Sequence, residues 1–186
     1  MDPLISYSIP IKGLRDGIHQ FDYQIDRSFF DHFENSPIGE SDIQLQLTLE
    51  KRTGLYILDF SFEGRIASNC DRCLSDIQLP IAGDYRLLVK VSEAAEEGEK
   101  EDEDPDVVFI TPEAQKLEVA PWAYEFICLS VPMIKTYDCE DEDPRPCNED
   151  MLDRLYAAEP QADAEEDNSP PDNPIWDELK KLNTDN

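Results

Sequence analysis

The residues of this chain best suited to chemistry are two cysteines placed three positions apart, Cys70 and Cys73. They lie between two stretches in which apolar and polar side chains alternate, as they do in β-strands. Paired thiolates at this spacing are common ligands of structural zinc, which binds four ligands in a tetrahedron. A second pair, Cys139 and Cys147, would supply the other two. One hypothesis is therefore a closed Zn²⁺ site built from these four cysteines.

Two other interpretations of the pair stay open. The first is two reduced cysteines in a tight turn that packs on a sheet. Leu74 favours it, because a zinc knuckle often has glycine after its second cysteine. The second is a thiol-redox pair, but such pairs lie at the start of a helix, and here a strand pattern follows. The remaining cysteine, Cys128, lies beside an apolar helical stripe and is expected to be a small buried side chain.

Other patterns typical of catalysis are missing from the sequence. Its only histidines, His19 and His32, stand in no recognisable nucleophile motif, and there is no glycine-rich phosphate loop. The many carboxylates lie in acidic runs, where they are expected to be solvated rather than to serve as acids or bases. An enzyme is therefore not expected.

The cysteine pair is predicted to be held by strands of an antiparallel sheet. Apolar and polar residues alternate over residues 43–50 and again over residues 55–62, on either side of a turn at Gly54. Residues 77–81 and 85–91 continue the sheet as a meander, with a turn or bulge between them. Four side chains of the first two strands are predicted to be buried: Leu45, Leu47, Leu58 and Phe60.

Shorter patterns surround this sheet. An opening strand is predicted between Leu4 and Ile11, and a second extended segment over residues 18–25. A short helix follows Asp26, and the main helix begins near Ala120 and ends before a proline. Residues 107–110 form a short strand that rejoins the sheet. The predicted fold class is α+β: an antiparallel β-sheet, a meander that is open or barrel-like, packed with one main helix and short helices.

The net charge of −27 is concentrated in two segments. Residues 92–106 hold nine acids and one lysine, and residues 138–186 hold seventeen acids and four bases. Segments of this composition bury too little apolar surface to fold, so we expect both to be largely disordered, with one or two helical turns allowed at Met151, Leu152 and Leu155. The predicted organisation is one domain, residues 1–137, with a flexible acidic loop at 92–106, followed by an acidic tail, residues 138–186. The tail ends in a short amphipathic helix at 175–182, whose Trp176, Leu179 and Leu182 are candidate partner contacts.

The expected location is the cytoplasm. No window approaches the length of apolar sequence that a membrane span needs, and no basic start precedes an apolar run. An odd number of cysteines, five, argues against a disulfide framework and for reduced thiols.

Four segments of the chain, taken in order, resemble the YceD family of large ribosomal RNA subunit accumulation proteins. They are the Phe29-Phe30 helix before an alternating strand, the turn at residues 70–74, the helix at residues 124–132, and the closing segment at residues 174–182. The resemblance implies a role in the accumulation or processing of 23S ribosomal RNA. It departs from the family at the second cysteine pair, which many members have as a compact turn.

A chain of this charge repels a polyanion, because phosphate contacts need lysine and arginine. Arg65 and Arg72 are the candidates for a small local RNA-binding or partner-binding patch. The acidic runs would instead attract a basic ribosomal protein. The expected function is therefore a non-enzymatic factor for 23S ribosomal RNA accumulation and ribosome biogenesis that acts through such a partner. A generic acidic interaction or chaperone module is the alternative, and a thiol-redox protein the weaker one.

Overall fold

A computed structural model describes residues 3–93, 106–136 and 143–158 of the chain. The chain divides into two units, Met1–Leu152 and Asp153–Asn186. Residues 94–105 of the predicted acidic loop and the terminal segment at 175–182 lie outside the described residues, as do Cys139, Trp176, Leu179 and Leu182. None of the described helices is long and apolar enough to cross a membrane.

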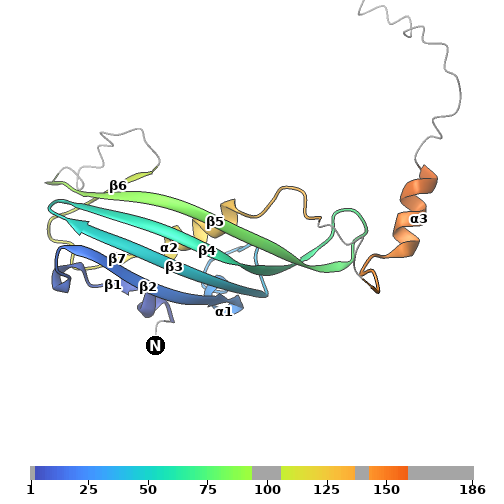
Figure 1. Ribbon diagram of the computed structural model, residues 1–186, viewed down its shortest axis with the longest axis horizontal. Helices are drawn as coiled ribbons and strands as arrows, with labels where there is room; N and C mark the ends of the chain where they lie inside the picture. The colour runs from blue at the N-terminus through green and yellow to red at the C-terminus, as the bar shows by residue number, and fades with distance from the viewer. Residues whose placement is uncertain (1–2, 94–105, 137–142, 159–186) are drawn as a thin grey trace, which may run out of the picture. The chain divides into compact units, whose positions relative to one another are not determined.

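One five-stranded sheet dominates the first unit (Figure 1). Its spatial order follows the chain: β2 (Gly17–Asp26), β3 (Ser41–Arg52), β4 (Leu55–Asn69), β5 (Asp76–Val91) and β6 (Val107–Ile110). The first four strands form the predicted antiparallel meander, and the described sheet is open, so the barrel-like alternative is wrong. Strand β6 does rejoin the sheet, but parallel to β5. The connection between these two strands is long enough for the crossover that parallel pairing needs.

The central hairpin confirms the prediction made from alternation. Residues 43–50 of β3 pair antiparallel with residues 57–64 of β4, with Leu47 opposite Phe60 and Leu49 opposite Leu58. Leu45, Leu47, Leu58 and Phe60 are all 0 to 1% exposed. Because side chains alternate across a strand, the same register sends every second residue to the opposite face of the sheet.

Strand β5 differs from its prediction, because it is one continuous strand and not two strands joined by a turn. Gly83 lies within it and packs closely against the end of a helix. A Cβ atom at this position would lie 2.7 Å from the Ser130 Oγ and 2.8 Å from the Phe62 Cζ. Glycine is present here because a neighbouring element approaches the strand closely, and not because the chain turns.

The N-terminal segment also differs from the predicted strand. It forms a 3₁₀-helix, η1 (Pro3–Tyr7), then the two-residue strand β1 (Ser8–Ile9) and a second 3₁₀-helix, η2 (Ile11–Gly13). Strand β1 pairs with β7 (Leu117–Glu118) in a separate two-stranded sheet. Proline cannot donate a ladder hydrogen bond, so Pro10 limits the length of the strand.

Two helices cover the core face of the large sheet. Helix α1 (Arg27–Phe30) begins where predicted, because the Asp26 Oδ1 accepts a hydrogen bond from the Ser28 backbone N–H at 2.8 Å. Helix α2 (Ala120–Leu129) is the predicted main helix. Its Phe126 packs edge-on against Phe60, with ring centroids 5.1 Å apart.

Cys128, on the same helix, is half-buried, whereas full burial was predicted. It lies on the side of α2 next to the buried stripe, where solvent still reaches part of the side chain, and burial raises the pKa of its thiol. A further helix, α3 (Glu149–Ala158), extends the one or two helical turns that Met151, Leu152 and Leu155 allow.

Candidate functional site

The cysteine pair occupies a tight turn between β4 and β5. The Cys70 backbone N–H donates to the Ser75 carbonyl and the Leu74 N–H donates to the Cys70 carbonyl, both at 2.8 Å. Leu74 has φ 60°, the left-handed conformation that glycine adopts most easily. Leucine therefore adopts here the backbone conformation that glycine often supplies at this position of a zinc knuckle.

The two sulfurs of this turn face the protein interior. Cys70 is 8% exposed and Cys73 is 2% exposed, and neither forms a disulfide. The pKa of Cys73 is lowered to about 6, chiefly because the Ser75 hydroxyl donates a hydrogen bond to its sulfur. Backbone N–H groups of Asn148 and Ser75 also donate to it, while burial acts in the opposite direction. These donors stabilise the thiolate, which is the form that binds a metal.

The segment after α2 is hydrogen-bonded to this turn. The Lys135 backbone N–H donates to the Asp71 carboxylate at 2.6 Å, and the Asp71 N–H donates to the Lys135 carbonyl at 3.0 Å. The turn is therefore fixed from two directions, by Lys135 and, through the Cys73 sulfur, by Asn148.

The structure brings Cys70 and Cys73 together and places Cys147, half-buried, against the same hydrophobic core. Cys139 lies outside the described residues. Within 3–93, 106–136 and 143–158, no group of three or more His, Cys, Asp or Glu side chains is arranged to hold a metal ion. The turn holds two of the four predicted ligands, and the described residues do not complete the four-cysteine set.

The zinc site therefore stays a prediction. Protein purified without chelator is expected to carry about one Zn²⁺ per chain, because a closed structural site needs all four thiolates around one ion. The double variant Cys70→Ser/Cys73→Ser should lose that metal, whereas Cys128→Ser should keep it. Elemental analysis of the three proteins checks this. A wild-type metal content near zero contradicts the zinc hypothesis and leaves the turn as a packed pair of thiols.

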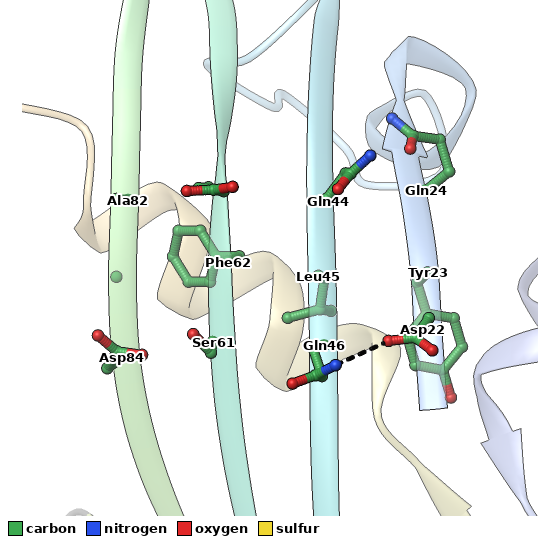
Figure 2. Close-up of a pocket in the computed structure, with 12 residues that line it drawn as sticks. Asp22, Tyr23, Gln24, Gln44, Leu45, Gln46, Ser61, Phe62, Ala82 and Asp84 are labelled. Atoms are coloured by element: carbon green, nitrogen blue, oxygen red, sulfur yellow. Dashed lines mark hydrogen bonds between the residues drawn. The ribbon is translucent and has the colours of Figure 1, made fainter. Parts of the chain in front are cut away.

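A second candidate site lies on the face of the sheet opposite α2, which we call the outer face. Its central part is a shallow groove made of two adjoining hollows of about 640 and 630 Å³. Both hollows are lined by Gln44, Glu63 and Ala82. Figure 2 shows Asp22, Gln46, Ser61 and Asp84 in a row across four strands, with the helix behind the sheet.

The groove carries four carboxylates that form no ion pair among the described residues, although Arg65 lies opposite Asp42 in the register. Among the described residues, no lysine, arginine or histidine forms an ion pair with any of four acids, which are Asp22, Asp42, Glu63 and Asp84. Within the described part of the chain, Asp22 and Asp42 accept side-chain hydrogen bonds from the amides of Gln46 and Gln24, at 3.1 and 2.6 Å.

Asp59 and Glu50, nearer the hairpin turn at Gly54, differ because each forms an ion pair with an arginine. One row away, the Arg86 guanidinium donates to both oxygens of Asp59, at 2.6 and 3.1 Å. Arg52 pairs with Glu50 at 2.7 Å. The acids of the groove therefore lack the ion pairs that Asp59 and Glu50 have.

The two arginines predicted as partner contacts lie in different parts of the first unit. Arg65 is exposed on the outer face and lines the second hollow of the groove. Arg72 is exposed in the cysteine turn. Their proposed companions Trp176, Leu179 and Leu182 lie outside the described residues, so the partner contacts stay a prediction.

The groove was missed by reasoning from the sequence, although part of the signal was present. The alternation in residues 43–50 already assigns Gln44 and Gln46 to a wet face. What it lacks is the cross-strand register, which sets Gln46 opposite both Asp22 and Ser61. Without this register, the sequence does not show that charges from four strands lie on one surface.

Comparisons with known proteins gave one match. No curated protein and no solved structure matches the chain. A protein-family model described as "Large ribosomal RNA subunit accumulation protein YceD" matches residues 58–183. That range includes most of β4, all of β5 and α2, and the cysteine turn.

Proposed function

Because the chain belongs to the YceD family, the large ribosomal RNA subunit accumulation proteins, we propose that it supports accumulation of 23S ribosomal RNA by binding a basic ribosomal protein. The family match over residues 58–183 carries the ribosomal part of this proposal. The charge of the chain supports the partner. A net charge of −27 attracts a lysine- and arginine-rich protein and repels ribosomal RNA.

The proposed role is that of a binding factor and not of an enzyme. The family is described by accumulation of an RNA and not by a reaction. Both histidines form local backbone contacts: His19 Nε2 lies 2.8 Å from the Arg15 carbonyl oxygen, and His32 Nδ1 lies 2.5 Å from the Ser28 carbonyl oxygen. This binding is proposed to take place in the cytoplasm, where a ribosomal partner would be available.

The mechanism proposed is shielding. A basic ribosomal protein binds RNA of many sequences through its cations, so its free form is prone to non-specific contacts. An acidic factor that covers those cations keeps the protein available for the assembling subunit. The accumulation of large-subunit RNA would then depend on this factor even though the factor does not read RNA.

Affinity purification of the full-length protein tests this proposal. After nuclease treatment, a basic protein of the large subunit is expected to remain bound. Binding should weaken about tenfold as salt is raised from low to physiological ionic strength, because unburied charges are screened over about 8 Å there. Protein and RNA in the eluate are identified at each salt concentration.

Three other results would each overturn part of the proposal. If nuclease removes all captured protein, the contact is with RNA. Tight binding of purified 23S fragments that Arg65→Glu or Arg72→Glu abolishes would make the cysteine-turn end an RNA contact. Capture of basic proteins without preference for ribosomal ones would favour the generic acidic interaction module.

A further inference from the structure

The outer face of the sheet has no packed partner among the described elements. Helices α1 and α2 and the aromatic core lie on the opposite face, and the burial of β3 alternates accordingly between buried leucines and exposed glutamines. In most antiparallel sheets such a face is simply wet. Two features distinguish this one. It has a hollow at its centre, and most of the charged side chains that line the hollow are acidic.

The hollow follows from the side chains that line it. Ser61 and Ala82 lie at the middle of the outer face of β4 and β5, and they are short. Longer side chains flank them on both sides, Asp22 and Gln46 from β2 and β3 and Asp84 from β5. Adjacent strands are about 4.8 Å apart, so the row from Asp22 to Asp84 spans about 14 Å. This width accommodates one extended segment or one turn of a helix.

The charge of the groove favours a cationic occupant. Asp22, Asp42, Glu63 and Asp84 come from four different strands, and Arg65 is the one basic residue among those that line the two hollows. No described cation pairs with any of the four acids. None of the four acids lies directly opposite another, but they share one surface with a single arginine. A basic ligand therefore meets complementary charge there, which favours its encounter with the groove and its specificity.

The groove also offers neutral polar groups to a peptide backbone. Gln44 lies at its centre, lines both hollows, and has no hydrogen-bond partner among the described residues. An amide side chain has both donors and acceptors, so it can bond to the N–H and C=O groups of a bound segment. The groove therefore combines contacts for a main chain with charges for lysine and arginine side chains.

We propose that this groove is the docking surface for a lysine- and arginine-rich segment of a protein. The inference rests on the proposed function and deepens it, because it gives the basic partner a place on the folded domain. RNA is disfavoured at the same surface, since its phosphates would face four carboxylates and a single arginine.

Two variants with the same net charge separate the groove from the general acidity of the chain. The groove variant is Glu63→Gln/Asp84→Asn. The control is Glu34→Gln/Glu113→Gln, which changes two exposed acids in the loops after α1 and β6, outside the groove. All four acids are on the surface, so both proteins are expected to fold, and circular dichroism verifies this. The full-length proteins are titrated with a fluorescent synthetic peptide of alternating lysine and serine at physiological ionic strength.

The groove variant is expected to bind this peptide about tenfold more weakly than wild type, and the control less than twofold more weakly. A photo-crosslinking amino acid at position 44 should also capture proteins extracted from purified large subunits, whereas one at position 113 should not. Equal weakening by the two variants, or capture from position 113 alone, overturns the groove and leaves the basic partner standing. If wild-type protein binds neither the peptide nor any large-subunit protein, the proposed function fails together with the groove.

Discussion

Replacing Phe60 with alanine is expected to lower the free energy of unfolding by about 4 kcal/mol. Phe60 is 1% exposed and lies opposite Leu47 on β3 and Tyr85 on β5. Its ring packs edge-on against Phe126 of α2, so it joins the sheet to the main helix. Removing the ring leaves a cavity bounded by the sheet on one side and the helix on the other. Neither can close it without moving the other.

Urea denaturation measures this effect, and Ser61→Ala is the matched control. Ser61 is the next residue on the same strand, but it lies on the outer face and is exposed. Its change is expected to alter the free energy of unfolding by less than about 0.5 kcal/mol. Comparable losses for the two variants would mean that the assignment of the two faces of β4 is wrong.

Replacing Gly64 with alanine is expected to destabilise the protein by about 3 kcal/mol, although it adds a single methyl group. The main chain of β3 lies close to Gly64 of β4. A Cβ atom at Gly64 would overlap the carbonyl oxygen of Asp42 and lie 2.5 Å from the Ile43 Cα. Both are main-chain atoms, so no side-chain rotation relieves the overlap, and the two strands would have to move apart. Gly64 also lines the second hollow of the groove, next to Glu63.

Gly39→Ala provides the comparison for this variant. A Cβ atom at Gly39 would meet nothing within 4 Å, and its backbone is not in the left-handed region. Alanine there should be neutral or stabilise slightly, because it reduces the conformational freedom of the unfolded chain. Thermal unfolding of both variants gives the contrast. A Gly64→Ala protein that melts with the wild type would show that the strands are farther apart than described.

The two predictions bear on the function as well as on stability. Phe60 and Gly64 belong to the same strand, which carries Ser61 and Glu63 of the groove between them. Gly64→Ala is therefore expected to weaken basic-peptide binding even in the fraction that is folded, because movement of β4 displaces Glu63. Phe60→Ala acts from the core face and should affect binding mainly through the fraction unfolded.

Local periodicity was enough to determine the central part of the fold. Alternation in residues 43–50 and 55–62 identified two strands and their buried faces, and a proline in the first turn together with an apolar stripe located α2. The cysteine turn was identified from residue types and spacing, and the order of four short motifs indicated the family. All of these features depend on residues that are near one another in the chain, so short stretches of sequence are enough to predict them.

Features that depend on contacts between residues far apart in sequence were decided only by the tertiary structure. Gly83 stays inside a continuous strand because Ser130 of the following helix cap packs against it, and glycine alone suggested a turn. Strand β1 forms where Leu117 and Glu118 lie alongside it, and the first residues otherwise form a 3₁₀-helix. The groove arises in the same way. Asp22, Asp42, Glu63 and Asp84 belong to four strands, and only the register of the sheet brings their charges onto one surface, because side chains far apart in sequence become neighbours only through strand pairing.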